Sequence, residues 1–223
     1  RHPAGFLPQI IGLYLMGSGG TIGQSEHSDL DIWVCHQPDL SETALAELTS
    51  KCQRITDWAA TQGSEAHFHL INPTEFSSGA RNNELAGEDC GSTQHYLLLD
   101  EFYRTAIMLG GRYPLWWLVP AYEEHQYDSY AEQLLSKRFV RGQDSLDFGH
   151  VAGVPAGEFV GAGLWQLYKG IDSPYKSVLK LLLTEVYSSE HPQVRCLSLD
   201  FKAAIYNGQL DADELDPYVM LYR

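Results

Sequence analysis

A short apolar run that stops at a cluster of small residues limits what the start of this chain can fold into. Residues 10–16 read IIGLYLM, and Gly17-Ser18-Gly19-Gly20 follow at once. An apolar run of this length bounded by turn-forming residues is typical of a buried strand. Residues 29–35, DLDIWVC, alternate in polarity and indicate a second strand. The chain therefore begins with two predicted strands joined by a Gly-rich loop.

The remaining elements divide the chain into two parts. The predicted elements are, in order, a helix over 41–62, a strand over 65–71, a helix over 92–109, and helices over 127–137, 158–169 and 174–187. Strand alternation largely disappears after Arg112. We therefore expect an α+β fold, with a mixed β-sheet and helices in residues 1–111 and a helical domain in residues 112–223.

The charge balance disfavours two classes of partner, nucleic acid and anionic membranes. The chain has 223 residues, with 15 Lys plus Arg against 29 Asp plus Glu, and a formal net charge of −14. This excess of acid disfavours unspecific binding to nucleic acid or to an anionic membrane. No apolar run reaches the roughly 18 residues that a membrane-spanning helix needs.

The ends and the cysteines suggest where the protein works. The start, RHPAGFLPQ, lacks a signal-peptide pattern and an initiator Met, so we expect a piece of a longer protein. The four Cys form no C-x-x-C pair, which fits a reducing cytosol better than a zinc site or a disulfide scaffold. We expect a cytoplasmic protein.

The Gly-rich loop and the second strand bring together groups that suit a nucleotide. Gly17 lets backbone N–H groups approach a phosphate, and Ser18 adds a hydroxyl donor. Asp29 and Asp31 share one face of the strand, roughly 6–7 Å apart. Paired carboxylates suit Mg²⁺, which also binds phosphate oxygens, and two such ions can assist an in-line displacement. A lone D-x-D or a lone Gly-rich turn is common, so it is the combination that indicates a site.

This combination resembles the nucleotidyltransferase superfamily of DNA polymerase beta. In that superfamily a third carboxylate lies on a following strand. The resemblance implies a nucleotidyltransferase-like fold in residues 1–111 and Glu65 as the third catalytic and metal-binding acid, beside Asp29 and Asp31. It also implies two Mg²⁺ ions, with Mn²⁺ as an alternative. An exposed charge at a strand edge is the other interpretation of Glu65.

Longer segments resemble the catalytic region of the bacterial class I adenylate cyclases. They are LYLMGS, GQS, SDLDIWVCH, GEDCGSTQHYLLLDEFYRTA and LWQLYKGIDSPYKSVLKLLL, in the family's order from about residue 13 to about residue 218. The resemblance implies conversion of ATP to cyclic AMP and diphosphate in the cytosol. It also implies a C-terminal regulatory region, outside these residues, that is coupled to the sugar phosphotransferase system.

Two other functions stay open at this point. The same site could transfer a nucleotidyl group to a separate hydroxyl, or the chain could be an ATP-binding sensor without turnover. Nothing in the sequence identifies an adenine pocket.

A cluster of lysines is the predicted counter-charge for the triphosphate. Lys169, Lys176 and Lys180 are half of the chain's six lysines and lie within twelve residues. Ser173, Lys176 and Lys180 share one face of the helix predicted over 174–187. We expect Lys169 and Lys176, and less so Lys180, to bind phosphate, with Ser173 at the helix start beside them. A solvated lysine face is the alternative.

The stretch GEDCGSTQH is a second candidate for nucleotide contact. The residues considered there are Glu88, Asp89, Ser92, Gln94 and His95, of which Ser92 is the predicted ligand. A free helix start binds anions, but acids beside it can equally be capping charges.

Other polar and aromatic side chains have ordinary structural interpretations. We expect an intrahelical ion pair between Asp100 and Arg104, no zinc at His67 and His69, and a solvent-exposed turn at DADELDP. The tryptophans expected in the core are Trp58, Trp116, Trp117 and Trp165.

Overall fold

The fold is described from a computed structural model, in residues 8–26, 28–78, 94–151, 153–209 and 211–222. Within them the elements are β1 (Ile10–Met16), β2 (Leu30–His36), α1 (Glu42–Thr61), β3 (Ala66–Ile71), α2 (Pro73–Ser77), α3 (His95–Thr105), β4 (Ile107–Gly111), β5 (Tyr113–Pro114), the 3-10 helices η2 (Leu115–Leu118) and η3 (Ala121–Gln126), α4 (Tyr127–Ser136), β6 (Ser145–Leu146), α5 (Ala156–Lys169), α6 (Pro174–Glu190), α7 (Leu197–Tyr206), α8 (Ala212–Leu215) and α9 (Pro217–Tyr222).

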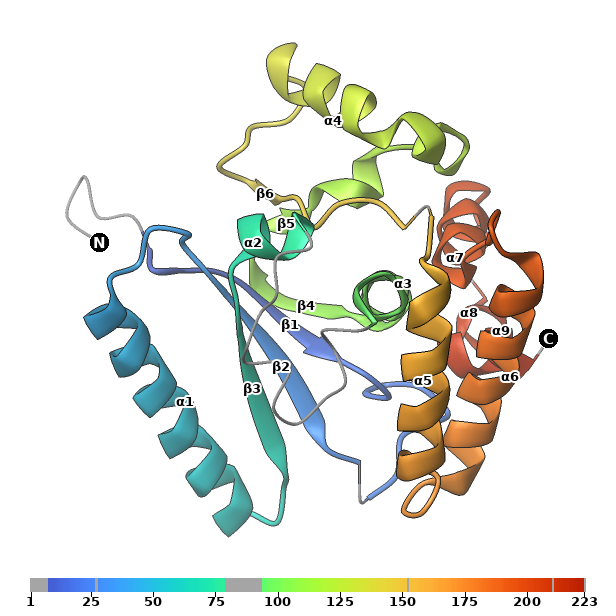
Figure 1. The fold of residues 1–223 in the computed structure, drawn as a ribbon. Coiled ribbons are helices and arrows are strands. Elements are labelled where there is room, and N and C mark those ends of the chain that lie inside the picture. Colours follow the sequence, from blue (N-terminus) through green and yellow to red (C-terminus); the bar gives the residue numbers. More distant parts are fainter. Residues whose placement is uncertain (1–7, 27, 79–93, 152, 210, 223) are drawn as a thin grey trace.

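A mixed sheet forms the centre of the molecule. Its strand order in the described residues is β3-β2-β1-β4, with β2 parallel to β3 and the other neighbouring pairs antiparallel. Helix α1 covers one face, and α3 lies on the other with α5, α6 and α7 beyond it (Figure 1). The predicted α+β architecture, a mixed sheet followed by helices, is confirmed.

One predicted helix is too long. The apolar pattern predicts that it continues to Leu109, but α3 ends at Thr105 and residues 107–111 form β4, which pairs with β1. A continuous apolar stretch fits a helix or a strand equally well, and here the free edge of β1 decides. Gly111 permits the close pairing, because a Cβ there would lie 2.5 Å from the Ile11 carbonyl oxygen.

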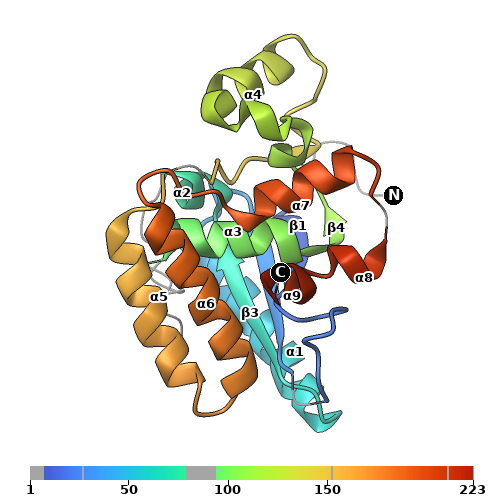
Figure 2. The same ribbon diagram turned by 90° about the vertical axis from the view of Figure 1, so that its right-hand side faces the viewer.

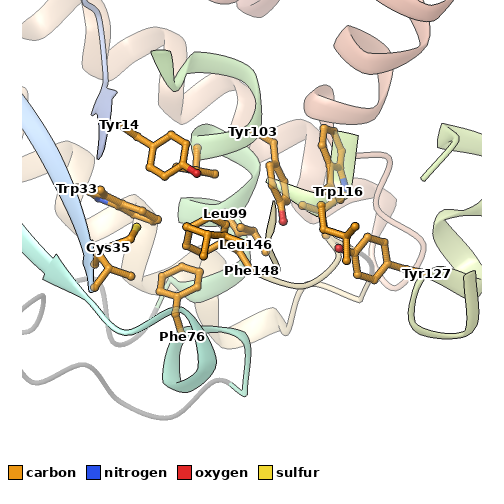
Figure 3. Close-up of a cluster of buried hydrophobic side chains, with 14 of the residues drawn as sticks. Tyr14, Trp33, Cys35, Phe76, Leu99, Tyr103, Trp116, Tyr127, Leu146 and Phe148 are labelled. Carbon is orange, nitrogen blue, oxygen red and sulfur yellow. The ribbon is translucent and has the colours of Figure 1, made fainter. Parts of the chain in front are cut away.

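The larger core lies between the sheet and the later helices. Tyr14 and Trp33 from the sheet face Phe76 from α2 and Phe148 from the chain after β6 (Figure 3). Trp116, from beyond residue 111, belongs to the same cluster. One core therefore extends across the division predicted at residue 111, and that division stays a prediction.

Helix α6 places its polar side against the rest of the protein. Its sequence predicts an apolar stripe of five side chains, Tyr175, Val178, Leu179, Leu182 and Val186. Leu179 is half-buried, and the other four are between 50% and 88% exposed. The lysines of this helix instead point inward, to hydroxyl and carboxylate partners. These polar partners on the neighbouring elements explain why the apolar side faces outward.

Two further expectations are corrected by the structure. Trp58 is 64% exposed on α1, although Trp116 is fully buried as expected. The acidic stretch DADELDP is not simply a solvated turn, because Asp216 is only 9% exposed and binds a distant loop. None of the helices in the described residues is long and apolar enough to cross a membrane.

Candidate active site

The Gly-Ser loop, residues 17–26, leaves the end of β1 in a compact turn. The Ser18 carbonyl accepts hydrogen bonds from the Thr21 amide and the Thr21 hydroxyl, at 3.1 and 2.7 Å. Gly17 and Gly20 have φ values of +84° and +74°, which favour glycine. Ser18 is buried, and its hydroxyl lies 3.3 Å from that of Ser28. The loop thus returns to the start of β2 with two serine hydroxyls together.

The paired aspartates lie beside this loop. Asp31 is opposite Met16 in the β1–β2 register, and an added Cβ on Gly17 would be 3.8 Å from Asp31 Oδ2. Its other oxygen lies 3.5 Å from His69 Nε2 on β3. Asp29 immediately precedes β2, on the same side as Asp31 by strand periodicity. The predicted juxtaposition of a Gly-Ser turn with two carboxylates is therefore present.

Glu65 lies at the start of the neighbouring strand. Its carbonyl accepts the Leu30 amide at 2.9 Å, which places it beside Asp29 in the parallel pairing of β2 and β3. The Glu65 side chain is 71% exposed and lies 3.0 Å from His67 Nε2. It is thus an adjacent-strand acid, as expected, but its carboxylate is engaged with His67. A metal-binding role for Glu65 stays a prediction.

Lys176 connects α6 to the Gly-Ser loop and to the start of β2. From the first turn of α6 its Nζ donates to the Ser18 hydroxyl at 3.2 Å and to the Ser28 hydroxyl at 3.1 Å. Burial lowers the Lys176 pKa, the negative charge of Asp29 opposes that shift, and Lys180 adds to it. The Lys176 ammonium group thus lies at the loop, beside one of the two aspartates.

The other predicted phosphate ligands of this region lie differently. Lys169 Nζ sits 5.2 Å from the centre of the Trp165 ring on its own helix. Lys180 Nζ pairs with Glu101 Oε1 at 2.7 Å, so its charge is already partnered. Ser173 is the residue before α6, but it makes no side-chain capping bond and is exposed. The structure therefore brings Lys176, alone of these four, onto the Gly-Ser loop.

The start of α3 is not a free anion site. Glu158 from α5 accepts the backbone amides of Tyr96 and Leu97 at 2.9 and 3.0 Å, and so caps the helix. His95 packs on the Phe76 ring, and burial lowers its pKa. Ser92, with Glu88 and Asp89, lies outside the described residues.

The donor set suits one kind of metal site. Within the described part of the chain, no three His, Cys, Asp or Glu side chains are grouped to hold a metal ion. Mg²⁺ is commonly bound by one or two carboxylates, with water and substrate phosphates completing its shell. Asp29 and Asp31 fit that arrangement, in which a nucleotide supplies the remaining oxygens.

Comparisons with known proteins identify the family. A model of the adenylate cyclase N-terminal domain matches residues 3–117, and a model of the second domain of class I adenylate cyclases matches residues 154–223. The chain belongs to the class I adenylate cyclase family.

Curated relatives agree and show how much of such a protein is present. The chain is 50% identical to the adenylate cyclase of Escherichia coli K12 over 222 residues, which are 98% of this chain and 26% of that relative. It is 46% identical to the adenylate cyclase of Proteus mirabilis over 220 residues, which are 99% of this chain and 25% of the relative. The chain thus spans about a quarter of the length of these relatives.

Solved structures also match this chain. A toxin–antitoxin structure with AMP-PNP is 18% identical, covers 60% of this chain and 77% of its own, and has a TM-score of 0.28. That score is too low to support a structural argument.

The site contains two features that sequence reasoning missed. Glu158 as the cap of α3 and Asp216 as a partner of the Gly-Ser loop both join residues far apart in the chain. Glu158 lies in the first turn of a helix and Asp216 directly precedes a proline, and both positions are typical of capping acids. Those local signals indicate a cap, but they do not indicate which distant amides it reaches.

Proposed function

We propose that this chain carries the catalytic site of an adenylate cyclase, which converts ATP to 3′,5′-cyclic AMP and diphosphate. The observation that carries the proposal is the position of Lys176, within hydrogen-bond distance of Ser18 and Ser28 and beside Asp29. A cation, two hydroxyls and two carboxylates then meet at one Gly-rich loop. Membership in the class I adenylate cyclase family supports the choice of reaction.

The chain's own residues would bind and orient the triphosphate. ATP carries about four negative charges, and an ammonium group acts on phosphate as a point charge. Lys176 would exchange its two serine partners for phosphate oxygens, and the Ser18 hydroxyl would then donate to the same group. In a protein with a net charge of −14, this local cation offsets the repulsion of the anionic substrate.

The reaction itself is intramolecular. The bond from the ribose 3′-oxygen to the α-phosphorus forms, the bond from that phosphorus to the bridging oxygen of the diphosphate breaks, and the 3′-hydroxyl proton passes to solvent water. Holding the two reacting atoms in line is therefore the main task of the protein. Asp29 and Asp31, with Glu65 as the predicted third acid, would hold two Mg²⁺ ions, whose chemistry is to acidify the hydroxyl and stabilise the departing diphosphate.

The test is the identity of the product. The chain is incubated with ATP and Mg²⁺, with and without glycerol as a separate hydroxyl acceptor, and the products are analysed by mass spectrometry. Cyclic AMP and diphosphate, at a yield independent of the acceptor, are the expected result. An adenylylated acceptor would replace the proposal with nucleotidyl transfer. ATP binding without any product would replace it with a sensor domain.

A further inference from the structure

Helix α9 contacts the Gly-Ser loop at two places. Asp216, which precedes α9, accepts the Ile22 amide on its Oδ2 at 2.7 Å. The next contact is between Gly23 and the ring of Tyr218, since a Cβ added to that glycine would lie 2.8 Å from the ring. Figure 2 shows α9 beside the blue segment that follows β1. Residues almost two hundred positions apart are thus joined at the loop.

The two oxygens of Asp216 serve different partners. Oδ1 accepts the amides of Tyr218 and Val219, at 2.8 and 3.3 Å, and so caps the first turn of α9. Oδ2 accepts the Ile22 amide. One buried carboxylate therefore fixes the helix and the loop with respect to each other.

Ile22 is well placed to control the loop. Its neighbour Thr21 binds the Ser18 carbonyl through both its amide and its hydroxyl, and the Gly23 amide donates to the Thr21 hydroxyl at 3.1 Å. Holding the Ile22 amide therefore holds the turn that begins at Ser18. Helix α9 also packs on α6, the helix that carries Lys176.

We infer that Asp216 is a positioning residue of the nucleotide site, which holds the Gly-Ser loop so that the Ser18 hydroxyl meets Lys176. The inference rests on the proposed function of that loop in binding the triphosphate of ATP. Asp216 does not touch the substrate. It acts through the Ile22 amide, and Tyr218 supports the same loop from the side.

The test separates the two roles of the carboxylate. Asp216→Asn keeps one side-chain oxygen, which can still cap α9. The side-chain NH2 group then faces the Ile22 N–H, and because both groups are donors no hydrogen bond can form there. The matched control is Asp211→Asn. Asp211 caps α8 in the same way, accepting the amides of Asp213 and Glu214, and it is exposed.

Two measurements are made on the whole chain. Amide hydrogen exchange of residues 17–26, without nucleotide, reports the loop directly and does not depend on the proposed reaction. In Asp216→Asn we expect faster exchange there, with unchanged exchange in α6. Steady-state kinetics should show a rise in KM for ATP of about fivefold or more, the lower range of coupling between two sites, with kcat changed much less. Asp211→Asn should match the unmodified chain in both.

The outcomes separate this inference from the function on which it rests. Unchanged loop exchange in Asp216→Asn overturns the inference. Faster exchange with an unchanged KM also overturns it, because the loop would then be held without consequence for the nucleotide. A fall in kcat at constant KM indicates a general loss of folded protein and contradicts a positioning role. If the unmodified chain makes no cyclic AMP, the proposed function fails, and faster loop exchange with weaker ATP binding by calorimetry still supports the role of Asp216.

Discussion

Lys180 Nζ lies 2.7 Å from Glu101 Oε1 and joins α6 to α3 one turn beyond Lys176. Burial by itself would raise the pKa of Glu101, but the charges of Lys180 and Arg104 together lower it. The pair is mostly buried, with 24% and 20% of the two side chains exposed. It therefore anchors the helix that brings Lys176 to the Gly-Ser loop.

Breaking this pair should destabilise the protein. Glu101→Gln leaves the Lys180 ammonium without its carboxylate, and we expect the free energy of unfolding to fall by about 1.5–3 kcal/mol, the usual range for a hydrogen bond to a charged group. Urea denaturation measures it. Glu132→Gln, an exposed glutamate on α4, is the control and should change little. A double-mutant cycle with Lys180→Met should show a coupling of at least about 0.5 kcal/mol, and purely additive losses would contradict the anchoring role.

The paired aspartates should be essential for turnover. Asp29→Asn or Asp31→Asn removes a charge that Mg²⁺ requires, so we expect cyclic AMP formation to fall by about 10²–10³-fold or more, the range for loss of one preorganised electrostatic group. Product formation is measured by mass spectrometry, and circular dichroism checks the fold. The control is Asp39→Asn, an exposed aspartate in the turn after β2. Near-normal turnover in either variant would show that the substituted carboxylate is not part of the catalytic site.

Lys202 gives the protein a pH-dependent stability. It is fully buried, donates to the Trp116 carbonyl at 2.5 Å and lies 3.9 Å from Glu124 Oε2. Burial lowers its pKa from 10.5 to about 8, with Glu124 opposing the shift. The unfolded chain therefore holds this proton more tightly. Consequently the free energy of unfolding rises as pH increases from about 8 toward 10.5, because the folded protein releases the Lys202 proton first. Below about pH 8 Lys202 is protonated in both states, and this gain in stability is absent.

Substituting Lys202 and, as a control, Lys51 tests this pH dependence of the unfolding free energy. Between about pH 8 and pH 10, the unfolding free energy of the unmodified chain should rise relative to that of Lys202→Met by roughly 2–3 kcal/mol. The tyrosines with raised pKa values are common to both variants, so their effect cancels in the difference. Lys51→Met, at an exposed position on α1, should follow the unmodified chain throughout. Parallel curves for Lys202→Met and the unmodified chain would show that Lys202 keeps an ordinary pKa.

The sequence predicts those parts of the site whose signals are local. The turn formers after β1 and the acids at i and i+2 lie within one strand–loop–strand unit, so spacing alone places Asp29 and Asp31 beside the Gly-Ser loop. The density of lysines in an acidic chain points to the cluster of Lys169, Lys176 and Lys180. That argument could not separate Lys176 from Lys169, because the two lie on different helices and Lys169 lies over the Trp165 ring of its own helix, α5.

What the sequence could not predict depends on long-range pairing. Residues 107–111 become a strand because β1 offers an edge, and Asp216 is buried because Ile22 reaches it from the other end of the chain. An apolar run or an acidic stretch has the same local appearance in either environment. The apolar side of α6 faces outward for a similar reason. The lysines on its other side form hydrogen bonds with Ser18, Ser28 and Glu101, which lie far away in the sequence.

The charge of Lys176 should contribute strongly to nucleotide affinity. Charge-assisted contacts to phosphate are worth about 1.5–3 kcal/mol, so Lys176→Met should weaken binding of a non-cyclisable ATP analogue roughly 10- to 150-fold, measured by calorimetry. Burial already lowers the Lys176 pKa, so its removal should cost the fold little. Lys137→Met is the control, because Lys137 is exposed and its Nζ donates to Gln133 Oε1 at 3.1 Å, one turn back on α4. Equal affinities for the two variants would make Lys176 an ordinary hydrogen-bonding lysine, and the positive counter-surface for the triphosphate would then have to lie elsewhere.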